Sequence, residues 1–141
     1  AVGRLDINTS GLMLFTNDGT LAHKLMHPSF EIDREYLVRA RGNFSEQKRK
    51  NMLLGVEIED NIYQFSDIVP GEKQSSNQWF SVCMLTGKNR EVRKLFESQD
   101  LEVSRLKRVR IGPIFLPSTL REGSWINLTE AQINELQNYG K

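Results

Sequence analysis

Apolar and polar residues alternate along residues 34–42, with Tyr36, Val38 and Ala40 on one face. This period of two predicts a half-buried strand. A continuous apolar run over residues 79–85 predicts a central strand that is buried on both faces. Further strands are predicted over residues 1–5, 11–16, 56–69, 103–111 and 123–128.

Four stretches have helical spacing instead, and a turn signal lies between two of the predicted strands. The helices are expected between Thr20 and Pro28, over residues 45–54, from a cap at Asn89 to about residue 99, and from a capping box at Thr129 to Gly140. Pro70 and Gly71 predict a polar, mobile connection over residues 72–77. Because strands predominate, we predict an α+β fold with a mixed, largely antiparallel sheet and short flanking helices.

The composition fits one soluble domain. The chain of 141 residues is 38% hydrophobic and 26% charged, which supplies both a core and a polar surface. No apolar run approaches the roughly 20 residues that span a membrane, and no signal peptide is visible. Cys83 is the single cysteine and lies in an apolar run, so we expect a buried thiol in a reducing, cytoplasmic setting. His23 and His27 lack further ligands nearby, and no metal site is expected.

The positive charge is concentrated in one part of the chain, although the net charge is only +1. Residues 86–112 carry eight basic side chains, beside a predicted helix start and along the predicted strand 103–111. Two interpretations remain open for that strand. It is a basic edge strand that discourages aggregation, or a stripe that contacts nucleic-acid phosphates.

A lone carboxylate, Asp6, follows the apolar start of the chain and precedes Asn8, Thr9 and Ser10, which favour a turn. The turn should fix this carboxylate beside the sheet. A turn aspartate that bonds its own backbone is the simpler interpretation of such a segment.

The residue patterns of four motifs favour a functional role for Asp6 over the simpler interpretation. They are Gly-Arg-Leu-Asp-x-x-Thr-x-Gly-Leu at 3–12 with Thr-Asn-Asp-Gly at 16–19, Arg-Glu-Tyr at 34–36, Lys-Asn-Arg-Glu-Val-Arg at 88–93, and residues 103–112. Together they resemble the pseudouridine synthases. Within that family they are most similar to the branch that modifies ribosomal RNA, and there to the enzymes of the large subunit.

The resemblance implies a fold and a set of roles. The fold would be a mixed sheet with a central catalytic cleft. Asp6 would be the catalytic nucleophile, Tyr36 would stack on the target base, and Arg93 would reach the Asp6 carboxylate, keeping it ionised and oriented. Substrate or RNA contact is assigned to Arg4, Asn8, Thr9, Lys88, Asn89, Arg90, Leu95, Arg105, Lys107, Arg108 and Arg110. Since uridine and pseudouridine are isomers, no cofactor is expected.

The resemblance also implies what accompanies this chain. Family members carry more of the catalytic domain and usually a small S4-like RNA-binding domain upstream, so we expect residues 1–141 to be most of a catalytic domain without those parts. A monomeric enzyme acting on large-subunit ribosomal RNA is the leading hypothesis. A paralogue for small-subunit or transfer RNA shares the same motifs. A non-catalytic RNA-binding or assembly module would not need Asp6, Tyr36 and Arg93 together.

Overall fold

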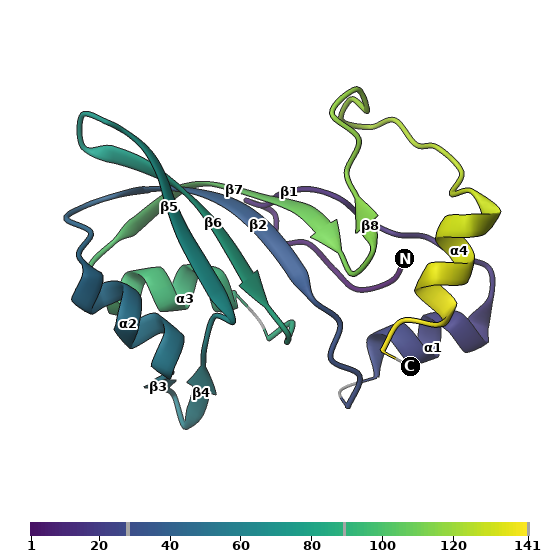
Figure 1. Cartoon of the computed structure of the whole chain (residues 1–141), viewed down its shortest axis with the longest axis horizontal. Helices are drawn as coiled ribbons and strands as arrows, with labels where there is room; N and C mark the ends of the chain where they lie inside the picture. The colour runs from purple at the N-terminus through teal and green to yellow at the C-terminus, as the bar shows by residue number, and fades with distance from the viewer. Residues whose placement is uncertain (28, 89, 141) are drawn as a thin grey trace.

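One twisted sheet runs through the protein, in a computed structural model that describes residues 1–27, 29–88 and 90–140 (Figure 1). Its strands follow the order β1-β7-β2-β6-β5, with β8 paired to β7, and a separate hairpin joins β3 to β4. Within these ranges only β1 and β7 pair in parallel; the other neighbours are antiparallel, which confirms the predicted mixed sheet. The bounds are β1 Ser10–Gly11, β2 Arg34–Arg41, β3 Val56–Ile58, β4 Asn61–Tyr63, β5 Asp67–Gln74, β6 Asn77–Met84, β7 Glu102–Ile111 and β8 Ile114–Phe115.

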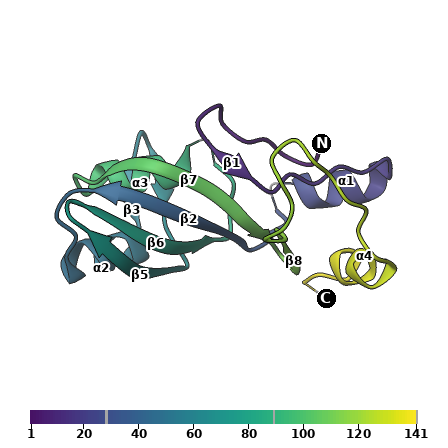
Figure 2. The ribbon, with the colours of Figure 1, turned by 90° about the horizontal axis from the view of Figure 1, so that it is seen from above.

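Short helices flank the sheet: α1 Gly19–Met26, α2 Glu46–Leu54, α3 Glu91–Ser98 and α4 Glu130–Gln137. Helices α2 and α3 lie under one end of the sheet, whereas α1 and α4 lie together beyond its other end (Figures 1 and 2). None of the helices in the described part of the chain covers the opposite face of the sheet, and none is long and apolar enough to cross a membrane.

Two hydrophobic cores follow from this arrangement. The first lies between the sheet and helices α2 and α3, and it contains the predicted inward face of β2, with Val38 and Ala40 at 0% and 2% exposure. The predicted stripe of α3 (Val92, Leu95 and Phe96) is buried in the same core and is confirmed. The second core joins the two ends of the described chain and contains Val2, Leu12, Leu14, Leu25, Ile32, Ile111, Ile114 and Leu136.

The prediction that β6 is buried on both faces is wrong. Phe80, Val82 and Met84 are buried, whereas the residues between them are half-buried. The physical reason is that α2 and α3 cover only one face of this antiparallel sheet. Nonetheless β6 is an inner strand, between β2 and β5.

The predicted mobile connection over residues 72–77 is also wrong, because β5 continues through Pro70 and Gly71 to Gln74. Strand β5 lies at the edge of the sheet, where a proline without an N–H group is tolerated. The pairing of β5 with β6 shifts between Pro70 and Lys73, as at a bulge.

Several smaller predictions differ in their bounds. Residues 123–128 form no strand, and Trp125 is 77% exposed. The strands predicted over 1–5 and 11–16 reduce to β1 and a single bridge between Val2 and Leu14. Asp18, rather than Thr20, caps α1 and accepts hydrogen bonds from the N–H groups of Thr20 and Leu21 at 3.0 and 3.1 Å.

The other predicted starts and ends of helices can also be compared with the structure. Helix α2 ends at Leu54, and Gly55, with φ of 110°, is its C-cap as predicted. The capping box of Thr129 is confirmed, but α4 ends at Gln137 with Asn138 at its C-cap rather than at Gly140. The predicted stop at Pro28 and cap at Asn89 lie outside the described residues.

Candidate active site

Asp6 opens a tight turn between the Val2–Leu14 bridge and β1. The N–H of Thr9 donates to the Asp6 carbonyl at 2.9 Å and closes the turn. The Asp6 side chain is 33% exposed, so its carboxylate is accessible while its backbone is fixed. Ile7 stands at the tip and is 98% exposed. The sequence thus correctly predicted a carboxylate held on a turn beside the sheet.

Arg108 holds both arms of this turn from β7. Its Nε and Nη2 atoms donate to the Leu12 carbonyl at 2.9 and 2.7 Å, and Nη1 donates to the Arg4 carbonyl at 3.5 Å. Arg108 is only 4% exposed. The predicted phosphate contact therefore does not fit Arg108, because its guanidinium is enclosed by the protein and bonded to backbone carbonyls.

Arg93 also holds the turn by a backbone carbonyl. It lies on α3, is 8% exposed, and donates from Nη2 to the Asn8 carbonyl at 2.7 Å. Among the described residues, the ion pair with Asp6 is made by Arg90 and not by Arg93: Arg90 Nη1 lies 3.7 Å from Asp6 Oδ2. The predicted direct contact of Arg93 with the Asp6 carboxylate is thus not formed.

The two arginines differ because of where they stand on α3. Arg90 is the N-cap residue, in the left-handed region with φ of 54°, and its side chain is 39% exposed. It reaches the carboxylate from the solvent side. Arg93 comes one turn later on the buried side and reaches the backbone of the turn.

The surroundings of Arg93 shift the pKa of its guanidinium in opposing directions. Burial lowers the pKa of the Arg93 guanidinium, and the positive charge of Arg90 acts in the same direction. The negative charge of Asp6 opposes that shift. The Nε atom of Arg93 is buried and makes no hydrogen bond within the described residues. The site thus contains a desolvated cation with an uncommitted donor beside an accessible carboxylate.

Tyr36 lies on β2 next to Arg108. The two residues are partners in the pairing of β2 with β7 and so share one face of the sheet, the face that packs on α3. Tyr36 is 9% exposed. Leu95, also assigned to the site, is fully buried in the core beneath this face. Tyr36 therefore stands between the core and the Asp6 turn.

Two residues that the sequence left without a role hold the loop before α3. Glu91 is 3% exposed and accepts hydrogen bonds from Thr86 Oγ1 at 2.8 Å and from the Lys88 N–H at 3.1 Å. Arg34 donates to the Leu85 carbonyl at 3.4 Å. Burial lowers the pKa of Arg34, while Tyr36 acts against the shift. An acidic residue in the first helical turn was the signal available for Glu91.

The remaining assigned residues are spread more widely. Arg4 and Asn8 are exposed and Thr9 is half-buried on the turn. Lys88 is exposed and donates to the Ile62 carbonyl at 2.5 Å. Asn89 lies outside the described residues.

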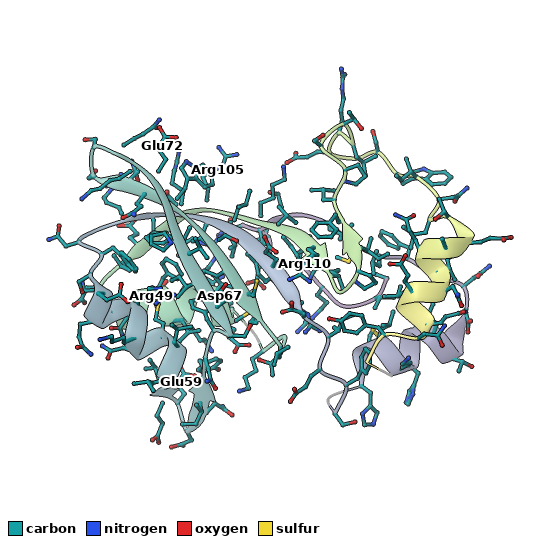
Figure 3. All side chains as sticks on the ribbon, in the orientation of Figure 1. Arg49, Glu59, Asp67, Glu72, Arg105 and Arg110 are labelled. Carbon is teal, nitrogen blue, oxygen red and sulfur yellow. The ribbon has the colours of Figure 1, made fainter. Side chains whose placement is uncertain are left out.

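Arg110 also departs from its predicted role. Its Nη2 and Nε atoms pair with Asp33 at 2.7 Å and Glu35 at 3.0 Å, and its side chain is only 13% exposed. Burial alone would lower the pKa of this guanidinium, but the hydrogen bonds to Asp33 and Glu35 raise it. Arg110 is therefore part of an internal ion-pair network near the middle of the molecule (Figure 3).

Two basic residues of β7 remain exposed, Arg105 and Lys107. Arg105 projects from the side of the sheet opposite to α2 and α3 (Figure 3). Strand β7 pairs with β2 along its length, and with β1 and β8 at its carboxyl end, so it is not a simple edge strand. The basic residues of the predicted stripe are therefore divided between exposed positions, Arg105 and Lys107, and enclosed ones, Arg108 and Arg110.

The mixed sheet, the aspartate turn held by buried arginines and the arginine beside its carboxylate can now be compared with known protein families. Residues 1–98 match the family model described as RNA pseudouridylate synthase. The chain belongs to this family.

Particular relatives refine this result. The ribosomal large subunit pseudouridine synthase B of Pseudomonas aeruginosa is 53% identical, covering 96% of this chain and 35% of the relative. The proteins of the same name from Vibrio cholerae serotype O1 and Escherichia coli K12 are 51% and 49% identical, covering 97% of this chain and 43% and 47% of the relatives. The chain thus spans less than half the length of these curated relatives.

Solved structures agree with the family. A crystal structure of pseudouridylate synthase matches with a TM-score of 0.83 at 26% identity, covering 96% of this chain and 58% of the other. An H/ACA ribonucleoprotein bound to a substrate RNA containing 2'-deoxyuridine matches with a TM-score of 0.64 at 20% identity, covering 84% of this chain and 40% of the other. The second match supports the fold alone.

Proposed function

We propose that this chain carries the catalytic site of an RNA pseudouridine synthase, which converts a specific uridine of large-subunit ribosomal RNA, with Asp6 as the nucleophile. The observation that carries the proposal is the Asp6 carboxylate, accessible on a turn that buried Arg93 and Arg108 hold by its carbonyls. The substrate class is supported by the relatives, which are named for the large ribosomal subunit.

The side chains of this site are sufficient for the proposed reaction. The bond from ribose C1' to uracil N1 breaks, the base turns, and a bond from C1' to C5 forms. N1 gains a proton and C5 loses one, so the atoms balance without an oxidant or a transferred group. Carboxylates are ionised at neutral pH and can serve as nucleophile or base without prior activation.

The neighbouring residues take distinct roles in this proposal. Arg90 orients the carboxylate through their ion pair. Arg93 fixes the turn through the Asn8 carbonyl and adds a buried positive charge near the carboxylate. Tyr36 forms an aromatic wall for the base after it leaves its stack, with Leu95 packed beneath it in the core. RNA contact is proposed for the exposed residues Arg4, Asn8, Lys88, Arg105 and Lys107, for the half-buried Thr9, and for Asn89, which lies outside the described residues.

We propose a wider setting as well. Residues 1–141 form most of a catalytic domain, and the complete protein acts as a monomer in the cytoplasm, on RNA before or during ribosome assembly. The partial coverage of the relatives supports the first of these statements.

The test uses complete protein and protein-free large-subunit RNA from a strain that lacks the enzyme. Pseudouridine is mapped by carbodiimide modification and primer extension. Wild-type protein should produce one new stop, Asp6→Asn none, and Arg93→Ala a greatly slowed reaction. A normal stop with Asp6→Asn would refute the nucleophile assignment. A stop only on small-subunit or transfer RNA would refute the substrate, and binding without modification would indicate a non-catalytic module.

A further inference from the structure

Two of the proposed RNA contacts, Arg105 and Lys107, lie on the face of the sheet away from the Asp6 turn. The turn is held from the other face, by Arg108 and by Arg93 of α3. Arg105 projects away from α2 and α3 (Figure 3), and Lys107, two positions later in the same strand, shares its face. This face carries none of the described helices (Figures 1 and 2). RNA that contacts these two residues is therefore not the segment at Asp6.

Like charges stand opposite one another on this outer face. Arg39 of β2 is the direct partner of Arg105 on β7. Such a cross-strand pair of like charges destabilises a sheet. Among the described residues, no carboxylate forms an ion pair with Arg39, Arg105 or Lys107. The protein thus leaves this positive charge uncompensated, as a surface for a polyanion does.

The side chain of Arg39 is held in place on this face. Its Nε donates to Ser104 Oγ at 2.9 Å, and Ser104 Oγ donates to the Arg39 carbonyl at 3.1 Å. Its Cζ lies 5.9 Å from the centre of the Trp79 ring, within the range of a cation–π contact. Trp79 is the partner of Arg39 on β6 and is half-buried. The guanidinium is therefore a fixed, planar group at the surface.

Apolar side chains lie beside these charges. Leu37 is 39% exposed and stands between Lys107 on β7 and Ser81 on β6, and Val69 on β5 follows Ser81 at 51% exposure. We define the outer patch by six residues, which are Leu37, Arg39, Val69, Trp79, Arg105 and Lys107. Planar and apolar groups among cations are complementary to the bases and phosphates of an unpaired RNA strand. An acidic protein segment would account for the cations but not for a guanidinium fixed over an aromatic ring.

We propose that the outer patch binds an unpaired segment of the RNA substrate, separate from the segment at Asp6. Arg39 provides the plane on which a base stacks, and Arg105 and Lys107 contact the neighbouring phosphates. The enzyme then contacts its RNA on both faces of the sheet. This inference deepens the proposed function and rests on it, because the ligand is the same RNA.

The experiment measures binding by fluorescence anisotropy, with complete protein and a labelled oligocytidine of about twelve nucleotides. This probe is single-stranded and contains no uridine for the active site. Arg39→Ala should weaken its binding at least about fivefold, the smaller effect expected for loss of one stacking partner. Arg39→Lys retains the charge but not the plane, so it should weaken binding similarly and leave the salt dependence unchanged. Arg105→Gln should reduce the slope of log K against log salt by about 0.7.

Lys50 provides a matched control, because it is exposed on α2, on the other side of the sheet. Lys50→Gln should change neither the affinity nor the salt slope. The urea unfolding midpoints of the Arg39 variants should equal that of the wild type, which separates binding from folding. An RNA stem that carries the mapped uridine, added to saturation, should not displace the oligocytidine.

Each other result decides against the inference. Unchanged binding by Arg39→Ala would overturn it, and so would full binding by Arg39→Lys, because charge alone would then explain the patch. An equal loss in Lys50→Gln would indicate non-specific attraction, and displacement by the stem would mean that both RNAs share one surface. If wild-type protein modified no RNA, the proposed function would fall. The oligocytidine assay needs no turnover and would still decide whether the outer patch binds RNA.

Discussion

Replacing Gly11 by alanine should release the Asp6 turn from the sheet. Gly11 pairs with Arg108 across β1 and β7, and its φ is +114°. A Cβ atom there would lie 2.1 Å from the Arg108 carbonyl oxygen and 2.6 Å from its nitrogen. Both are backbone atoms of an inner strand, so they cannot move away as the end of a flexible side chain could.

The cost can be worked from these contacts. Backbone strain at a sparsely populated φ contributes about 1–3 kcal/mol. Separation of β1 from β7 breaks the hydrogen bond from the Leu12 N–H to the Arg108 carbonyl, 2.8 Å long, and each such bond contributes about 1 kcal/mol. We expect Gly11→Ala to lower the free energy of unfolding by about 2–4 kcal/mol, a large part of the roughly 5–15 kcal/mol of a typical domain.

Two other glycines provide matched controls. Gly3 has φ of +81°, but a Cβ atom added there would meet no heavy atom within 4 Å, so Gly3→Ala isolates backbone strain, about 1–2 kcal/mol. Gly19 has neither strain nor contact and begins α1. Gly19→Ala should be neutral or slightly stabilising. Urea unfolding followed by tryptophan fluorescence measures all three, and pseudouridine formation should be lost for Gly11→Ala alone.

The reasoning would be refuted if Gly11→Ala and Gly3→Ala differed by less than about 0.5 kcal/mol, within the scatter of ordinary surface substitutions. That result would mean that the close approach of β1 to Arg108 contributes nothing beyond strain. Normal activity of Gly11→Ala would show, in addition, that Asp6 does not depend on this clamp.

Arg110→Met should lower the free energy of unfolding by about 1–2 kcal/mol, because the half-buried carboxylates of Asp33 and Glu35 lose their partner; unchanged stability with weaker RNA binding would instead restore Arg110 to an RNA-contacting role. Lys107→Glu, at an exposed position on the same strand, should keep the unfolding midpoint, weaken RNA binding and reduce its salt dependence, and an unaltered salt slope would count against RNA contact there. Burial raises the pKa of the Cys83 thiol, so iodoacetamide should react more slowly with folded than with urea-unfolded protein below about pH 9; equal rates would contradict this.

Local signals in the sequence were sufficient for much of the fold. The alternation in β2, the stripe of α3 and the capping box at Thr129 depend on residues within a few positions of one another. The Asp6 turn belongs to the same group, because Asn8, Thr9 and Ser10 favour turns wherever they stand. These elements were therefore predictable without knowledge of their neighbours.

The roles of the arginines were not predictable in this way. Arg108 finds its acceptor at Leu12, 96 residues away, and Arg110 finds Asp33, 77 residues away. A basic residue in a strand is expected to be exposed, and only tertiary contacts reveal that it is paired. The same holds for Arg93, because the position of α3 against the turn decides whether it reaches a carboxylate or a carbonyl.

The second core has a consequence for the timing of activity during protein synthesis. Val2 and Leu14, which flank the Asp6 turn, share that core with Leu136, and Lys24 of α1 donates to the Gln137 carbonyl, 113 residues away. Contacts of such long sequence separation form late and slowly. The Asp6 turn, although synthesised before α4, is expected to gain its full support only after α4 has been synthesised and released from the exit tunnel. The proposed activity would thus be absent from a nascent chain until that point, whatever RNA lies nearby.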